Sequence, residues 1–176
     1  DEGRQARAFP GDARSEDDMI AIFDQVEAEV GPVEVAVFNI GANVNFPIAE
    51  TTVRVYTKVW EMACYSGFLA GREAARLMLP RGRGCIFFTG ATASLRGGIG
   101  YAAFASAKFG LRAVAQSIAR ELGPQNIHVA HLIIDSGVDT AWVRERIKER
   151  EGEEALKNLD SGRLMTPASV AETYWQ

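Results

Sequence analysis

Tyr101 and Lys108, in the middle of the chain, carry a phenol and an ammonium group, both of which can hold and exchange a proton. Residues three and four apart lie on one face of a helix, so Tyr101, Phe104 and Lys108 would share a face if the helix begins early. The phenol would then begin about 4.5 Å further along the helix axis than the ring of Phe104. Two interpretations of Tyr101 stay open. In the first, Tyr101 is a proton donor and Thr92 and Ser94 supply hydroxyl groups to the same site. In the second, Tyr101 is a wall of the substrate pocket and Thr92 and Ser94 only form turns.

Helices and apolar strands alternate along the chain and would position these side chains. Ser15, followed by Asp18 three residues later, is a capping signature for a first helix, which Gly31-Pro32 ends. Further helices are predicted over Thr52–Leu79, over Gly100–Leu122, in the charged segment to Leu159, and from Thr166-Pro167 onward. Strands are predicted over Ala6–Phe9, Val33–Phe38, Cys85–Phe88 and Ile127–Ile134.

The predicted strands are short apolar runs, and Val33–Phe38 has the pattern of a parallel strand buried on both faces. Alternation of such strands with helices indicates an α/β fold with a doubly wound parallel sheet. Ligands of these sheets bind beyond the carboxyl ends of the strands. Three loops rich in glycine and short polar residues lie there: Asn39–Val44, Thr89–Ile99 and Asp135–Ala141. Together they predict a small-molecule site.

Four segments, taken in order, resemble the short-chain dehydrogenase/reductase family. One is Phe104-Ala-Ser-Ala-Lys108 with Thr89-Gly-Ala-Thr-Ala-Ser94 before it, which is similar to the catalytic segment. The others are Asp12-Ala13, Asn39-Ile-Gly-Ala42 and Asp135-Ser-Gly-Val-Asp-Thr140. The resemblance implies that NAD or NADP binds. It places Asp12 and Ala13 at the adenine, Asn39, Gly41 and Ala42 along the cofactor, Lys108 at the nicotinamide ribose, and Val138 and Thr140 at the nicotinamide amide.

The resemblance also shows which catalytic side chains this sequence lacks. In the family a Tyr exchanges a proton with the substrate oxygen, a Ser holds the carbonyl group, and an Asn completes a proton relay through water. The corresponding positions hold Phe104, Ala91 and Ala63. Only Lys108 remains of this set, and Tyr101 is the best remaining proton donor.

The composition excludes several other classes of protein. The net charge is −4, and the only basic cluster is the turn Arg81-Gly-Arg83, which argues against nucleic acid or an anionic membrane as partner. No apolar stretch reaches membrane-spanning length. Cys64 and Cys85 are expected to be buried thiols in a reducing compartment, the cytoplasm. His128 and His131 would point to opposite faces of one strand, so no metal site is predicted.

The first predicted strand resembles the third strand of the family, and no Gly-rich strand–turn–helix precedes it in the sequence. The resemblance therefore implies a single NAD(P)-binding, Rossmann-type domain over residues 1–176 that is incomplete, and we expect a fragment of a longer chain that lacks the first strands and the last strand. The predicted function is an NAD(P)-dependent oxidoreductase with a divergent active site, acting on a carbonyl or alcohol group of a small molecule. The alternative is a catalytically inactive dinucleotide-binding protein that acts as a redox sensor or scaffold. The two long helices resemble those that form homodimers and homotetramers in the family.

Overall fold

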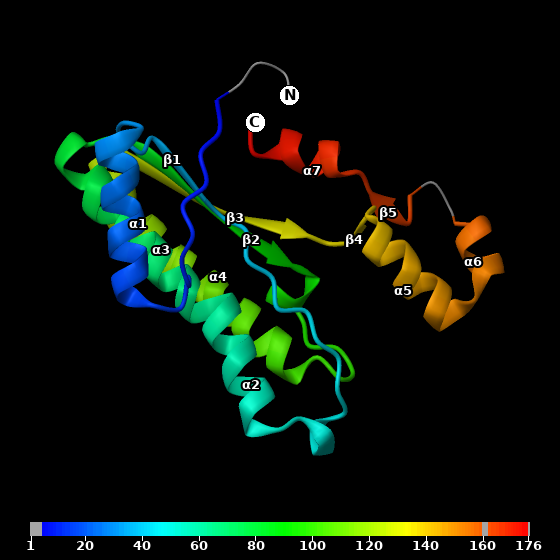
Figure 1. Cartoon of the computed structure of the whole chain (residues 1–176). Helices are drawn as coiled ribbons and strands as arrows, with labels where there is room; N and C mark the ends of the chain where they lie inside the picture. The colour runs from blue at the N-terminus through cyan, green and yellow to red at the C-terminus, as the bar shows by residue number, and fades with distance from the viewer. Residues whose placement is uncertain (1–4, 160–161, 176) are drawn as a thin grey trace. The chain divides into compact units, whose positions relative to one another are not determined.

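The computed structural model describes residues 5–159 and 162–175. By their contacts the residues group into two compact units, Asp1–Leu132 and Ile133–Gln176, and each is described by itself (Figure 1). The prediction of a single domain over residues 1–176 stays a prediction.

The first unit alternates helices with the strands of one sheet, as the sequence predicts. Its helices are α1 (Glu16–Glu29), α2 (Val53–Trp60), α3 (Ser66–Met78) and α4 (Ala102–Leu122). Its strands are β1 (Val35–Phe38), β2 (Gly84–Ala91) and β3 (Ile127–Ile134), which continues into the second unit. The sheet order is β1-β2-β3, and β1 and β2 are parallel, with Val35 opposite Cys85 and Phe38 opposite Phe88. The α/β class is confirmed.

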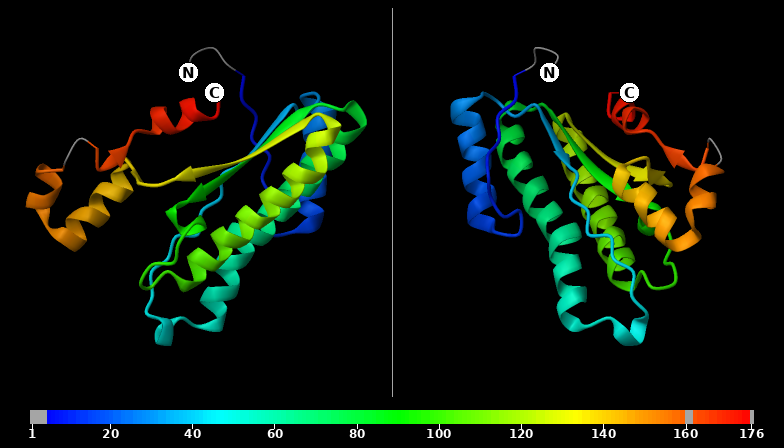
Figure 2. Two further views of the ribbon diagram at one scale, coloured as in Figure 1. Left: turned by 180° about the vertical axis from the view of Figure 1, so that it is seen from behind. Right: turned by 45° about the vertical axis from the view of Figure 1, so that its right-hand side comes forward.

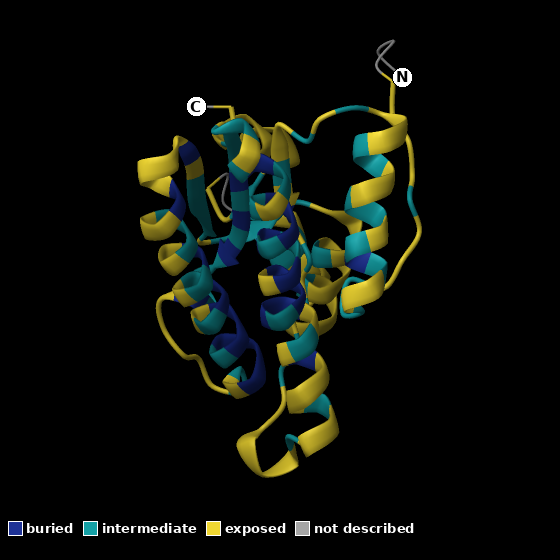
Figure 3. Cartoon of the chain, turned by 90° about the vertical axis from the view of Figure 1, so that its left-hand side faces the viewer, coloured by how far each residue is buried: buried dark blue, intermediate teal, exposed yellow. Residues whose placement is uncertain are grey.

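The core lies between the sheet and helices α3 and α4. Its largest buried cluster joins Phe38 and Phe88 of the strands to Met78 of α3 and Leu111 of α4. Figure 3 shows that the buried residues of α3 and α4 gather on the sides where the two helices face each other. This packing fixes α4 beside the carboxyl ends of β1 and β2, so it decides where Lys108 lies.

Two arginine residues of α3 connect it to α1. Glu73 is almost fully buried and its carboxylate accepts hydrogen bonds from Arg72 and Arg76. Each arginine also pairs with one acid of α1, Arg72 with Glu16 and Arg76 with Asp24. A buried carboxylate needs such partners, because burial of an unpaired charge costs several kcal/mol. The network holds α1 against α3, and the ribbon views of Figure 2 show these two helices side by side.

Two predictions about the strands are wrong. Residues 6–9 form no strand, since no described strand pairs with them and a strand is stable only when its backbone groups are bonded to a neighbour. Strand β1 is not buried on both faces, because Val35 and Val37 are 53% and 49% exposed. The helices of the first unit cover the face of β1 that carries Ala36 and Phe38. An apolar run thus predicts the strand but not what covers each face.

The predicted helix over 52–79 is interrupted. A π-helical turn, Glu61–Tyr65, separates α2 from α3. The backbone N–H of Ser66 bonds to the carbonyl of Glu61 in place of the carbonyl of Met62, which an α-helix would use. The Ser66 hydroxyl instead donates to the Met62 carbonyl at 2.5 Å. The turn contains Ala63, the position that the family resemblance gives to Asn.

The second unit contains a short parallel pair of strands and three helices. Strand β4 (Gly137–Val138) pairs with β5 (Leu164–Met165). The predicted charged helix is two helices, α5 (Ala141–Glu151) and α6 (Glu153–Lys157), because Gly152 between them has a φ of 90° that ends α5. The last helix, α7 (Pro167–Thr173), begins with proline as predicted. Among the described residues of both units, no helix combines the length and the apolar character that a membrane crossing requires.

Candidate functional site

Lys108 lies at the centre of the site, at the carboxyl ends of two strands. Its side chain projects from α4, where the residue is only 3% exposed. The ammonium Nζ donates to the carbonyl of Thr89, at 2.9 Å, and to the carbonyl of Ile40, at 3.3 Å. Burial lowers the pKa of Lys108 to about 8, because the charged form loses hydration. The two carbonyl groups therefore hold a cation at the edge where ligands of such sheets bind.

The positions of the missing proton carriers lie together in an apolar cluster. Ala63 and Phe104 are buried in it, and Ala91 packs against it. The ring of Phe104 lies 5.9 Å from the Lys108 ammonium, centroid to nitrogen, and 6.4 Å from the ring of Tyr101, centroid to centroid. The structure thus places these positions as neighbours in space, and none of the three side chains can exchange a proton.

The two replacement groups considered in the sequence have different surroundings. Ser94 is fully buried, and its hydroxyl accepts a hydrogen bond from the backbone N–H of Ala91 at 3.2 Å, so it forms the turn after β2. Tyr101 precedes the first residue of α4 and is half-buried beside Phe104. Its phenol is the one hydroxyl group among the described residues of this cluster.

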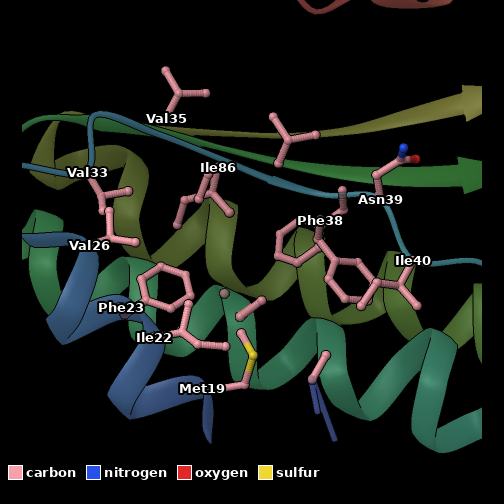
Figure 4. A pocket seen from close by; sticks show the side chains of 16 residues that line it. Met19, Ile22, Phe23, Val26, Val33, Val35, Phe38, Asn39, Ile40 and Ile86 are labelled. Atoms are coloured by element: carbon pink, nitrogen blue, oxygen red, sulfur yellow. The ribbon is translucent and has the colours of Figure 1, made fainter. Parts of the chain in front are cut away.

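An apolar groove of about 340 Å³ lies between α1 and β1 (Figure 4). Met19, Ile22 and Phe23 of α1 form one wall, and β1 forms the other. Two residues predicted to meet the cofactor, Ala13 and Asn39, line the same groove, and Asn39 is its only polar side chain. The structure therefore brings together two segments that are 26 positions apart in the sequence, by 39 − 13.

Asp12, beside this groove, is exposed and already paired. Its carboxylate accepts hydrogen bonds from the Arg14 guanidinium, at 2.9 Å from Nε to Oδ1 and 2.6 Å from Nη2 to Oδ2. The Arg14 side chain and backbone N–H lower the pKa of Asp12 to about 2. Its backbone N–H donates to the Asp18 carboxylate, and the Asp18 backbone N–H donates to the Ser15 hydroxyl, so Ser15 caps α1 as predicted. The side chain is thus a fixed carboxylate at the start of α1.

The remaining predicted cofactor contacts differ in burial. A side chain at Gly41 would meet no atom within 4 Å, whereas Ala42 packs against the cluster that contains Phe104. Val138 and Thr140 belong to the second unit. There Val138 pairs with Met165, and the Thr140 hydroxyl caps α5 by accepting from the Val143 N–H at 3.2 Å.

Three features of the site are absent from the sequence prediction. The carbonyl groups of Ile40 and Thr89 leave no signal, because every residue has a carbonyl group. The π-helical turn has no motif that would reveal it. His131, predicted as an ordinary histidine, lies against Gly90 and next to the charges of Lys108 and Arg112. Its position three residues from His128 gave the correct prediction that the two rings face opposite ways: His131 faces the buried residue Gly90, and His128 is exposed.

Comparisons with known proteins agree with this geometry. The family model described as "Enoyl-(Acyl carrier protein) reductase" matches residues 1–175. The 3-oxoacyl-[acyl-carrier-protein] reductase MabA of Mycobacterium tuberculosis is 31% identical over 160 residues, which are 91% of this chain and 64% of MabA. The 2-dehydro-3-deoxy-D-gluconate 5-dehydrogenase of Formosa agariphila is 29% identical over 128 residues, 73% of this chain and 48% of the relative. The chain thus spans about half to two thirds of the length of these relatives.

Solved structures show the same fold. A short-chain dehydrogenase from Rhodopseudomonas palustris is 57% identical, with a TM-score of 0.74, over 94% of this chain and 64% of that one. ElxO, solved with NADP bound, has a TM-score of 0.85 over 95% of this chain and 68% of its own, but only 18% identity, so it shows the fold alone. The chain belongs to the short-chain dehydrogenase/reductase family.

Proposed function

We propose that the protein is an NAD(P)-dependent oxidoreductase that interconverts a carbonyl and an alcohol group on a small molecule. The observation that carries the proposal is the Lys108 ammonium, held by the carbonyl groups of Ile40 and Thr89 at the ligand-binding edge of the sheet. The named relatives, a reductase and a dehydrogenase, support the same reaction class. They do not favour a non-catalytic redox sensor or scaffold.

NAD or NADP fits the residues that line this edge. Bound there, the nicotinamide would supply or accept the hydride. Lys108 would bind the ribose hydroxyls through its remaining N–H. Ala13 and Asn39, which share the apolar groove, would face the adenine half together with Asp12. Gly41 and Ala42 would lie along the cofactor, and Val138 and Thr140 would meet the nicotinamide amide.

Tyr101 is the proposed proton donor to the substrate oxygen. Its ring lies beside Phe104, which occupies the position of the usual Tyr, so both rings border the same apolar cluster. A positioned acid or base of this kind contributes roughly 10²–10⁴-fold to a rate. Lys108 would act on the cofactor, and Tyr101 would act on the substrate.

The proposal is tested with the full-length protein, NADH or NADPH, and a panel of ketones and aldehydes, by the loss of absorbance of the reduced cofactor. We expect turnover that falls by roughly 10²–10⁴-fold in Tyr101→Phe, with the cofactor dissociation constant unchanged. Tyr56→Phe, which removes an exposed phenol from α2, is the control and should keep full activity. Cofactor binding without turnover by the natural protein would contradict the enzyme, and no binding at all would contradict the cofactor site.

We further propose a homodimer or homotetramer in the cytoplasm. Long helices α3 and α4 expose Phe68 and Phe109, which are 41% and 43% accessible, and α2 exposes Trp60. Exposed aromatic side chains are enriched where subunits meet. Cys64 and Cys85 are both free thiols, as in proteins of a reducing compartment. Light scattering after size-exclusion chromatography measures the assembly, and Phe68→Glu should shift it toward the monomer.

A further inference from the structure

His131 occupies a closely fitted place behind the site. It lies on β3, the neighbour of β2 in the sheet. A Cβ atom added at Gly90 of β2 would lie 2.1 Å from the His131 Cε1, so only glycine leaves room for the imidazole. Nitrogen Nε2 of His131 is buried and has no hydrogen-bond partner among the described residues. A buried polar atom of this kind requires an explanation, because leaving it unpaired costs about 1–3 kcal/mol.

The chemistry of the ring makes Nε2 an acceptor. His131 interacts with its own backbone, and because Nε2 has no partner among the described residues, we assign that interaction and the ring proton to Nδ1, which leaves the lone pair on Nε2. Burial, followed by the positive charges of Lys108 and Arg112, lowers the pKa of His131 to about 4. The imidazole is therefore neutral at pH 7. The uncharged ring therefore offers the lone pair of Nε2 as an acceptor near the positive charges of Lys108 and Arg112 on α4.

The Lys108 ammonium supplies the matching donor. It has three N–H groups, and the structure shows two of them bonded, to Thr89 and to Ile40. Thr89 directly precedes Gly90, the residue against which the His131 ring packs. The ammonium and the imidazole thus lie against adjacent residues of β2, the ammonium at the carbonyl of Thr89 and the imidazole at Gly90.

We propose that His131 is a positioning residue for Lys108: a water molecule bound between its Nε2 and the ammonium gives Lys108 a third acceptor in place of the relay that Ala63 cannot form. A bridging water molecule can connect a buried donor and a buried acceptor that do not form a direct hydrogen bond with each other. In this arrangement the third N–H of Lys108 stays directed toward the sheet until a ligand competes for it. The inference rests on the proposed function in one respect, the role of Lys108 in binding the cofactor.

The pKa of Lys108 itself gives the test, because a packing residue without an acceptor would not change it. Selectively ¹³C-labelled lysine gives a spectrum in which Lys108→Met identifies the signal of Lys108. In the full-length protein without cofactor we expect His131→Phe to lower the pKa of Lys108 by about 1, the loss of one hydrogen bond to a charged group. Lys108 and Arg112 are the charged groups that act on the ring of His131, and both remain in the variant.

His128→Phe is the matched control, since this exposed histidine lies on the same strand and packs edge-on against Phe87. It should leave the pKa of Lys108 unchanged. His131→Gln, which retains an acceptor oxygen, should restore most of the natural value. If His131→Phe does not fold, His131→Leu replaces it as the variant without an acceptor. An unchanged pKa of Lys108 in a folded variant without the acceptor overturns the proposal.

The same samples separate this inference from the proposed function. A lower pKa of Lys108 in His131→Phe, in a protein that binds neither NADH nor NADPH, would support the His131–Lys108 bridge and contradict the cofactor site. Cofactor binding and turnover with an unchanged pKa of Lys108 in His131→Phe would support the proposed function and contradict the His131–Lys108 bridge.

Discussion

The two sides of Lys108 differ in chemistry. Toward the sheet its ammonium meets the carbonyl groups of Ile40 and Thr89. Toward the start of α4 it meets the ring of Phe104, and beyond it the cluster that contains Ala63 and packs against Ala91. Backbone carbonyl groups persist whatever side chain is substituted, whereas each proton carrier is a single side chain. This fold can therefore keep a cation site while it loses a proton relay.

The largest expected effect comes from returning polar groups to the apolar side. Ala91→Ser/Phe104→Tyr places a hydroxyl and a phenol beside Lys108, and we expect the rate of carbonyl reduction to rise by roughly 10²–10⁴-fold. The measurement is kcat/KM with NADH or NADPH and the best carbonyl of the panel. Gln116→Tyr adds an exposed phenol to the same helix and should leave kcat/KM unchanged. A folded, cofactor-binding double variant without increased activity would show that the apolar side lacks more than these two groups.

The next effect concerns the cation itself. The pKa of Lys108 is about 8 in the folded protein and 10.5 in the unfolded chain, so the unfolded chain binds more protons between these values. Stability must therefore rise with pH across this window, and the cost of burying the cation is fully present below pH 8. Relative to Lys108→Met, the natural protein should gain about 3 kcal/mol of unfolding free energy between pH 8 and 10.5.

Urea unfolding of both proteins at several pH values measures this difference. Lys58→Met, at an exposed position of α2, controls for the loss of a lysine and should show the pH dependence of the natural protein. Parallel curves for the natural protein and Lys108→Met would mean that the carbonyl groups of Ile40 and Thr89 compensate fully for burial.

The sequence predicts the frame of this site better than its contacts. Capping and turn residues give α1 and α4 within two residues, and the apolar run Ile127–Ile134 coincides with β3. Phe104 lies near both Tyr101 and Lys108, but only Phe104 and Lys108 share the periodicity of α4, because Tyr101 precedes the helix.

Contacts between distant segments have no such local signal. The residues next to Gly90 in the sequence do not indicate that its lack of a side chain makes room for His131, which lies 41 positions later (131 − 90). The apolar run of β1 is also compatible with burial of one face of the strand or of both faces. Only the structure shows that the face carrying Val35 and Val37 is exposed. The π-helical turn is a third case, because its register depends on packing around Ala63 and Cys64.

That turn gives the smallest expected effect, on the backbone of the apolar side. Ser66→Ala removes the hydroxyl that donates to the Met62 carbonyl, the group that the π-helical register deprives of the Ser66 N–H. Because Ser66 is fully buried, we expect a loss of about 1–3 kcal/mol of unfolding free energy. Ser117→Ala removes the same kind of bond, to Ala113, from an exposed turn of the regular helix α4. There alanine should be neutral or stabilising by about 0.5 kcal/mol, since it is the better helix former. Equal changes in the two variants would mean that the hydroxyl adds nothing beyond an ordinary helical serine and that Ala63 is placed by packing alone.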